Sequence, residues 1–289
     1  MAAITNVRTL RRRIRSVQNT AKITKAMQMI AASKMRRAQQ LSVAGRPYSE
    51  KMQAVLANVA AQSTDIEETN PLLTKREVKR IEVIHVTPDR GLCGGLPSNL
   101  NRSLGQFILD NSASVSVVGV GKKGRDFVAR TGNDLRAFFS DLGDRPSLES
   151  VLPISHIAIE DYVSGFADEV HVAYGYFVST AIQRPVIRKL LPVEPAELEP
   201  DQKAGYIYEP RSADLLTELL PRFVEMQIFH AILESVASEH SARMVAMQNA
   251  TDSANEMIDA LTLVLNKVRQ ESITKELLDI VGGVAALEG

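Results

Sequence analysis

Apolar residues recur at steps of three and four along both ends of the chain. In the first segment these positions are Ile4, Val7, Leu10, Ile14, Val17, Ala21, Thr24, Met27, Ala31, Met35 and Ala38. In the last segment they are Leu233, Val236, His240, Met244, Met247, Thr251, Ala254, Ile258, Leu261, Leu265, Val268 and Ser272. This period predicts two long helices, each with one narrow apolar face made of small residues and methionines.

The two predicted helices differ in length. Gly45 and Pro47 mark a break or kink in the first helix, which leaves about 39 helical residues and a rod of roughly 60 Å. No Gly or Pro occurs between Arg222 and Val281, so the second helix can form a rod of roughly 90 Å. Neither helix could bury its apolar face alone, so we expect the two to pack as a coiled coil. The longer helix then projects beyond its partner.

The middle of the chain, roughly residues 78–208, has a different pattern. It alternates β-rich runs with helical segments. The predicted strands are Ile81–Val86, Val115–Val120, Leu135–Phe139 and Val170–Phe177. The predicted helices cover residues 98–110, 122–131 and 153–166. This alternation predicts a Rossmann-like α/β domain with a mostly parallel sheet. The predicted domains are therefore 1–62, 63–208 and 209–289, namely one helix of the coiled coil, the α/β domain and the other helix.

Charge is distributed unevenly, although 34 basic and 34 acidic residues cancel overall. Residues 1–40 contain ten Lys and Arg and no Asp or Glu, whereas the segment from Arg211 onward has six basic and twelve acidic residues. The two ends can therefore attract each other. An Arg-rich, acid-poor start is also typical of a mitochondrial presequence or a nucleic-acid arm, although the first 47 residues offer no aromatic side chain to stack on a base.

The last stretch, residues 280–287, carries no charged side chain. On a helix without a partner, such an uncharged apolar tip favours insertion into an apolar sleeve. A frayed terminal tail is the alternative interpretation.

Two glycine-rich turns suggest enzymatic chemistry. Gly119, Gly121 and Gly124 form a G-x-G-x-x-G pattern between a strand and a helix, which is the arrangement of a dinucleotide site, although it does not follow the first strand of the layer. Residues 91–95 form a second turn but lack the Gly-Lys-Ser/Thr of a phosphate loop. The chain has one cysteine, Cys93, and five histidines, and the histidines do not have the spacing of metal ligands. The sequence thus indicates no self-contained catalytic site, no cofactor and no metal.

Three groups of residues carry a resemblance to the γ subunits of rotary F-type ATP synthases. Near the start these are residues 17–20, 22–27 and 31–36, and near the end residues 238–252, 266–270, 273–277 and 280–283. Between them, residues 89–95, 121–124 and 168–170 fit the central domain of that family. The resemblance covers essentially the whole chain in order.

The resemblance implies a rotor shaft without a catalytic site of its own. An antiparallel coiled coil of the two ends would insert into a hexamer of α and β subunits, and the α/β domain would stand on the c-ring beside the ε subunit. No nucleic acid is expected as a partner, and membrane association would occur only through the complex.

The resemblance also assigns roles to residues. The expected rotor–stator contacts are Lys25, Met27, Arg269, Gln270, Thr274 and Glu276, and the expected apolar bearing tip is Ile280, Val281, Val284 and Leu287. An alternative interpretation of Met27 is that it packs between the two helices. The alternative for Arg269 and Gln270 is that they belong to a solvated helix face.

The chain departs from the family pattern in a few places. Pro88 and Pro97 occur where relatives usually lack proline, which puts the turn geometry there in doubt. A single Cys93 leaves no room for the regulatory cysteine pair of chloroplast members. The family motif begins almost at Met1, so we expect a bacterial protein at the cytoplasmic face of the plasma membrane.

Overall fold

The computed structural model describes residues 7–62, 70–194 and 212–288. Its contacts divide the chain into two compact units. The first, Ala31–Arg243, contains a β-sheet, and we call it the α/β unit. The second combines Met1–Ile30 with Met244–Gly289, and we call it the helical unit. Within the described residues, no helix is long and apolar enough to cross a membrane.

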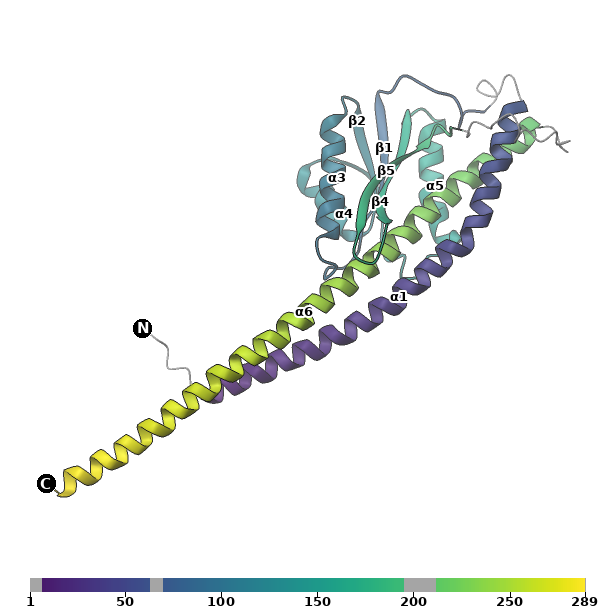
Figure 1. Ribbon diagram of the computed structural model, residues 1–289. Coiled ribbons are helices and arrows are strands. Elements are labelled where there is room, and N and C mark those ends of the chain that lie inside the picture. The colour runs from purple at the N-terminus through teal and green to yellow at the C-terminus, as the bar shows by residue number, and fades with distance from the viewer. Residues whose placement is uncertain (1–6, 63–69, 195–211, 289) are drawn as a thin grey trace. The chain divides into compact units, whose positions relative to one another are not determined.

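Two very long helices begin and end the described chain. Helix α1 spans Val7–Gln62 and helix α6 spans Ser212–Glu288 (Figure 1). The break expected at Gly45 and Pro47 does not occur, because α1 continues through both residues. Proline removes one helical hydrogen bond, and the turns that follow it bury Met52, Leu56 and Val59 in the core, which favours continuation of the helix.

The sheet of the α/β unit has five strands in the order β3-β2-β1-β4-β5. The strands are β1 (Arg80–Val86), β2 (Ser114–Val120), β3 (Asp134–Phe139), β4 (Glu169–Phe177) and β5 (Gln183–Leu191). The first four are parallel to their neighbours, and β5 pairs antiparallel with β4. The four predicted strands and the mostly parallel sheet are confirmed.

Helices α3 (Leu96–Asp110), α4 (Lys122–Thr131) and α5 (Leu148–Val163) connect the parallel strands. The predicted helix over residues 153–166 begins later than α5 does. In the structure α5 begins after Ser147, whose hydroxyl accepts a hydrogen bond from the Ser150 amide. Pro153 instead lies inside the helix.

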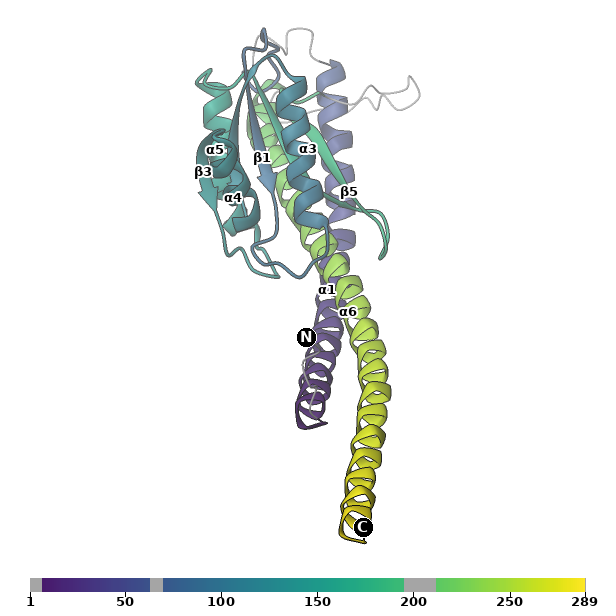
Figure 2. The same cartoon turned by 90° about the vertical axis from the view of Figure 1, so that its left-hand side faces the viewer.

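The sheet separates two apolar cores, and Figure 2 shows helices on both of its faces. Alternate residues of β1 point to opposite faces, as the pleat of a strand requires. Ile81 and Val83 pack with α3 and α4, whereas Ile84 and Val86 pack with α5, α6 and α1. Within the α/β unit, both long helices therefore share a core with the sheet.

Strand β5 is not among the strands predicted from the sequence. This strand lies at the edge of the sheet and contains Pro185, Arg184, Arg188 and Lys189. Proline and basic residues are tolerated at an edge because one side of the strand has no ladder to complete. The composition therefore hides the strand, and only its pairing with β4 identifies it.

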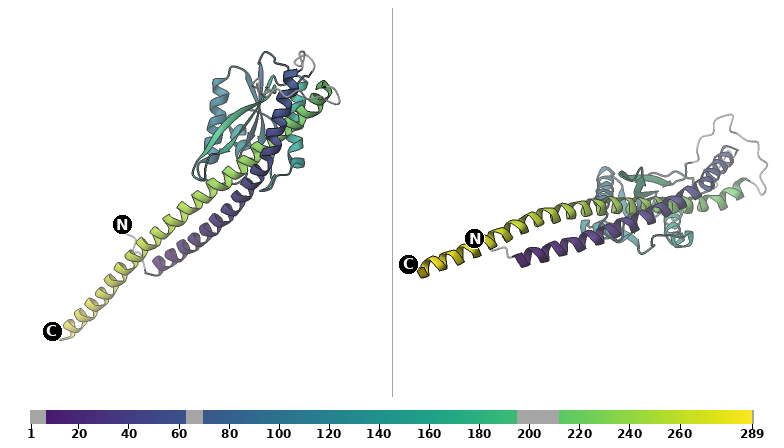
Figure 3. Two further views of the ribbon diagram at one scale, coloured as in Figure 1. Left: turned by 45° about the vertical axis from the view of Figure 1, so that its right-hand side comes forward. Right: turned by 60° about the horizontal axis from the view of Figure 1, so that its bottom comes forward.

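In the helical unit, α1 and α6 lie side by side and antiparallel (Figure 3). The Thr24 and Thr251 hydroxyls hydrogen-bond at 2.7 Å, and the Gln28 amide donates to the Gln248 carbonyl oxygen. Each step toward the start of α1 is thus matched by a step toward the end of α6. The predicted coiled coil is confirmed.

Candidate functional site: the unpartnered end of α6

The antiparallel register leaves the last part of α6 without a described partner. Thr24 lies against Thr251, so Val7, the first described residue of α1, lies opposite about Val268. The burial pattern agrees, because Val268 is partly buried and every described side chain from Arg269 to Val284 is exposed. At 1.5 Å per residue, the segment from residue 269 to 288 extends roughly 30 Å beyond this level.

The predicted contact residues of α6 lie on residues 269–288, which we call the free segment because no described residue of α1 reaches their level. Arg269, Gln270, Thr274 and Glu276 are all exposed. Glu276 accepts a hydrogen bond from the Ser272 hydroxyl at 3.4 Å, one turn away on the same helix. These side chains are therefore accessible to another protein, as a contact surface requires.

The predicted bearing tip is also exposed. Ile280 and Val281 are each 64% accessible and Val284 is 50% accessible, which is unusual for three large apolar side chains on one helix end. The side chain of Leu287 lies outside the part of the structure that is described. Exposed apolar side chains also continue back along α6, at Ile273, Leu277 and Leu278.

The apolar face changes direction along α6. Continuing the buried stripe beyond Val268 at steps of four and three leads to Ser272, Lys275 and Asp279, which are polar. The exposed apolar residues Ile273, Leu277, Ile280 and Val284 follow the same spacing on a different side of the helix. The free segment therefore presents an apolar face that is not an extension of the face that packs on α1.

Lys25 and Met27 lie at a different level of the helical unit. Lys25 is exposed, whereas Met27 is half-buried beside the contact with α6. The register places Lys25 opposite about Ala250, which is some 19 residues, or roughly 30 Å, from Arg269 along α6. The structure thus does not bring the predicted contact residues together in one cluster.

A polar layer between the helices was missed by the sequence analysis. The predicted stripe passed through Met27, but Gln28 makes the contact across the helix pair, to Gln248. The Gln248 amide in turn donates to both carboxylate oxygens of Asp252, at 2.9 and 3.1 Å. Polar layers of this kind specify the register of a coiled coil, and a pattern search for apolar residues overlooks them.

Comparison with known proteins identifies the family. A family model described as ATP synthase matches residues 6–287. The ATP synthase gamma chain of Dehalococcoides mccartyi is 60% identical, with 98% of this chain and 99% of the relative covered. That of Chloroflexus aurantiacus is 48% identical over 97% and 98% of the two chains. This chain belongs to the ATP synthase gamma-chain family.

Solved structures share the fold of this gamma-chain family member. A chain of the Euglena gracilis mitochondrial ATP synthase superposes with a TM-score of 0.67 at 19% identity, covering 97% of this chain and 94% of that one. A central-stalk chain of the Tetrahymena thermophila enzyme gives a TM-score of 0.61 at 24% identity, covering 79% and 99%. At sequence identities this low, the similarity to these structures shows that the fold is shared.

In this gamma-chain family member, the backbone amides at the end of the G-x-G-x-x-G turn are hydrogen-bonded to other groups of the same chain. The amides at the start of α4 are those that a pyrophosphate would need. The chain itself provides their acceptors, because Lys122, Lys123 and Gly124 donate to the Asp89 carboxylate, the Pro88 carbonyl and the Thr87 hydroxyl, respectively. The Asp89 carboxylate thus lies where an anion would bind, and the dinucleotide interpretation is wrong.

The remaining candidate groups are buried. Burial raises the pKa of the Cys93 thiol, which makes it a poor nucleophile at neutral pH. Burial also lowers the pKa of His85 to about 4, and this ring lies 2.9 Å from the Asn101 side chain. Among the described residues, no three His, Cys, Asp or Glu side chains converge as a metal site requires.

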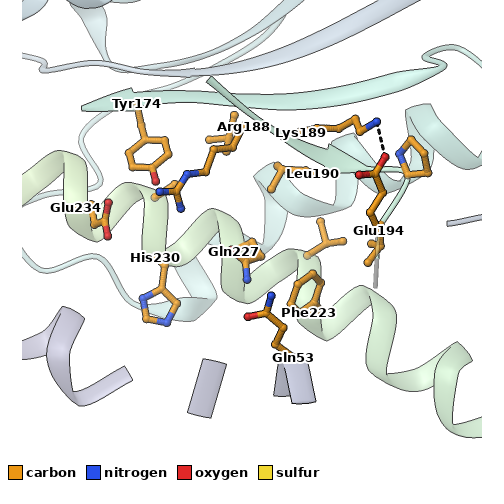
Figure 4. Close-up of a pocket in the computed structure, with 15 residues that line it drawn as sticks. Gln53, Tyr174, Arg188, Lys189, Leu190, Glu194, Phe223, Gln227, His230 and Glu234 are labelled. Carbon is orange, nitrogen blue, oxygen red and sulfur yellow. Dashed lines mark ion pairs between the residues drawn. The ribbon is translucent and has the colours of Figure 1, made fainter. Parts of the chain in front are cut away.

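A pocket of about 290 Å³ lies in the α/β unit between β5 and α6 (Figure 4). Charged side chains that line the pocket interact with other side chains of the protein. Lys189 pairs with Glu194 at 2.7 Å, and the Arg188 guanidinium lies 5.7 Å from the centre of the Tyr174 ring. The imidazole of His230 is packed so closely that a Cβ on Gly45 of α1 would come within 2.7 Å of it. These contacts indicate that the residues that line the pocket stabilise the fold.

Proposed function

We propose that this chain is the central rotor shaft of an F-type ATP synthase, coupling ion flow through the membrane c-ring to ATP synthesis and hydrolysis on the β subunits. The observation that carries the proposal is the 77-residue helix α6, whose last turns are exposed, rich in apolar residues and lie beyond Val7, the first described residue of α1. Membership of the gamma-chain family supports it. The partners are the α and β subunits of the hexamer, the ε subunit and the c-ring.

The shaft itself does no chemistry in this proposal. Its two helices differ in length and charge, so a rotating shaft presents a different surface to each of three surrounding β subunits. Each β subunit is then biased toward a different nucleotide affinity, which is a population shift driven by rotation. Catalysis belongs to the β subunits.

The contact residues have separate roles along the helical unit. Lys25 and Met27 form one level of rotor–stator contact with acidic loops of β, and Arg269, Gln270, Thr274 and Glu276 form another. The tip of Ile280, Val281, Val284 and Leu287 turns in an apolar bearing at the top of the hexamer. The exposure of the described members of the second and third groups supports this assignment.

The chain joins the membrane through the complex, as a peripheral subunit at the cytoplasmic face of a bacterial plasma membrane. The segments 1–62 and 209–289 form the shaft, and 63–208 forms the foot on the c-ring. Part of these boundaries, in residues 63–69 and 195–211, lies outside the described residues.

Co-expression with α and β subunits from the same source tests the proposal. We expect a complex with one copy of this chain for three αβ pairs, isolated by size exclusion, and ATP hydrolysis that depends on this chain. A chain that elutes apart from α and β would refute the rotor function.

A charge at the tip provides a second test. Val281→Asp should leave the folded chain unchanged, because this side chain is exposed, but should slow ATP-driven rotation or weaken assembly, because a carboxylate would enter an apolar bearing. Ser272→Asp is the matched control, as an exposed polar position on the same free segment. Equal rotation rates for the two variants would contradict the bearing assignment.

A further inference from the structure

Three separate loops of the α/β unit hold one short stretch of α6, residues 238–243. These loops are the β4–β5 connection, the loop after β3 and the loop after β1. The contacts are side-chain hydrogen bonds and ion pairs, and the helix side chains that make them are largely buried. The stretch is the last part of α6 in the α/β unit, which ends at Arg243.

Two serines hold the hairpin formed by β4 and β5. The buried Ser238 hydroxyl donates to the carbonyl of Gly175, within β4, at 2.8 Å, and a Cβ on Gly175 would lie 3.3 Å from that of Ser238. The Ser241 hydroxyl donates to the Thr180 carbonyl at 2.7 Å and accepts from the Gln183 amide at 3.4 Å. Both serines are fully buried, so their hydroxyls are committed to these contacts.

The loop after β3 is held through Asp144, which contacts both long helices. One carboxylate oxygen lies 3.0 Å from Nε2 of His240 on α6, and the other lies 2.6 Å from Nζ of Lys34 on α1. The Arg243 guanidinium, which can only donate, lies 3.3 Å from Nδ1 of His240. Nδ1 is therefore the acceptor, and Nε2 carries the proton that is donated to Asp144.

The loop after β1 is held by Arg243. Its guanidinium donates to the Gly91 carbonyl at 3.3 Å and to the Glu239 carboxylate at 2.7 Å, one turn back on α6. Glu239 thereby fixes the rotamer that directs Arg243 toward the loop.

These contacts reach the helix over more than half of its circumference. Successive helix residues are about 100° apart around the axis, so Ser238, Ser241, His240 and Arg243 together cover roughly 220° of the circumference. The apolar packing of earlier turns of α6 already resists rotation of the helix about its own axis, because rotation would expose its buried stripe. Hydrogen bonds from three directions add a resistance that depends steeply on distance and angle.

We infer that Ser238, His240, Ser241 and Arg243, with the loop groups that they bind, form a collar that transmits torque between the α/β unit and α6. Asp144 extends the collar to α1 through Lys34. The inference rests on the proposed rotor function and names positioning residues for it. The collar fixes the helices to the domain at the level where the α/β unit ends.

The test measures torsional stiffness in the assembled complex. A bead is attached to the α/β domain, the hexamer is fixed to a surface, and angular fluctuations are recorded during pauses. Asp144→Asn with Ser241→Ala weakens the ion pair to Lys34 and removes the bond to Thr180. We expect about a twofold wider variance of the bead angle, since contacts from two of the three directions are weakened.

The matched control is Ser140→Ala with Asp141→Asn. It also removes one serine hydroxyl and one carboxylate charge, in the same loop as Asp144. Ser140 donates to Asp141, and Asp141 pairs with Lys122, and none of these three residues is on α6. Its variance should equal that of the wild type. A collar variant as stiff as the control would overturn the inference, whereas failure of the wild-type chain to assemble would refute the rotor function itself.

If the double variant does not assemble, Asp144→Asn alone decides the question. Asp144 is about half-exposed, so this change leaves the core intact. A variance equal to that of the control in the single variant would overturn the inference, and a wider variance would support it.

Discussion

Gly121→Ala is expected to destabilise the chain by roughly 4 kcal/mol or more, among the largest effects available to a single methyl group. Gly121 precedes α4 with a φ of +100°, which side chains rarely adopt. A Cβ at this position would lie 1.9 Å from the Thr87 carbonyl oxygen and 2.8 Å from its carbon. These are backbone atoms at the end of β1, so the central strand would have to move.

Urea unfolding of the full chain measures this effect, and two other glycines serve as controls. Gly132 has a φ of +71° but open space around its Cβ position, so Gly132→Ala should cost only about 1 kcal/mol. Gly91 has neither constraint, and Gly91→Ala should stay within about 0.5 kcal/mol of the wild type. If Gly121→Ala unfolds at the same urea concentration as Gly132→Ala, the close approach to Thr87 is not the constraint.

Glu82→Gln should stabilise the chain at alkaline pH. Glu82 lies on β1 in the core, with a fully buried side chain. Burial and the neighbouring Asp161 carboxylate raise its pKa to about 8, against the opposing effect of Arg136. Arg136 forms its ion pair with Asp161 and not with Glu82, through two hydrogen bonds of 2.8 and 3.0 Å. Glu82 is therefore protonated in the folded chain at neutral pH.

The direction of the pH dependence follows from proton binding. Between pH 4.5 and 8 the folded chain holds a proton on Glu82 that the unfolded chain has released, so stability falls as pH rises. One proton taken up on folding corresponds to a limiting slope of about 1.4 kcal/mol per pH unit. Glutamine has no such proton to lose.

Denaturation at pH 5, 7 and 9 tests this prediction. The variant and the wild type should be nearly equal at pH 5, and the variant should gain steadily with pH. Glu169→Gln is a control in the same sheet, at a carboxylate that remains partly exposed and pairs with Lys189. An advantage of Glu82→Gln that does not grow between pH 5 and pH 9 would show that Glu82 is not protonated in the folded chain.

Part of the candidate site could be predicted from the sequence because it depends on local pattern. The apolar face of α1 and the uncharged end of α6 are visible as spacing and composition. Arg269, Gln270, Thr274 and Glu276 are exposed, and their contact with a stator stays a prediction. Whether Met27 contacts a stator remains a prediction, since this side chain is half-buried beside α6.

The rest depends on pairs of residues far apart in the chain. The collar joins Ser241 to Thr180, Arg243 to Gly91, and His240 to Asp144. The histidine lies on the predicted apolar stripe of its helix, so its spacing suggests packing alone. Its loop partner is supplied by the fold, and no spacing rule relates the two.

The sequence alone is enough to predict two long helices of unequal length, a mostly parallel sheet between them, and an uncharged stretch at residues 280–287 near the end of the second helix. These features follow from periodicity and composition, which act within a few turns or one strand. Tertiary structure alone decided that β5 completes the sheet, that Asp89 lies at the start of α4, and that residues 238–243 hold three loops. Each of these requires a partner distant in sequence, because a hydrogen bond is specified by where two groups meet in space.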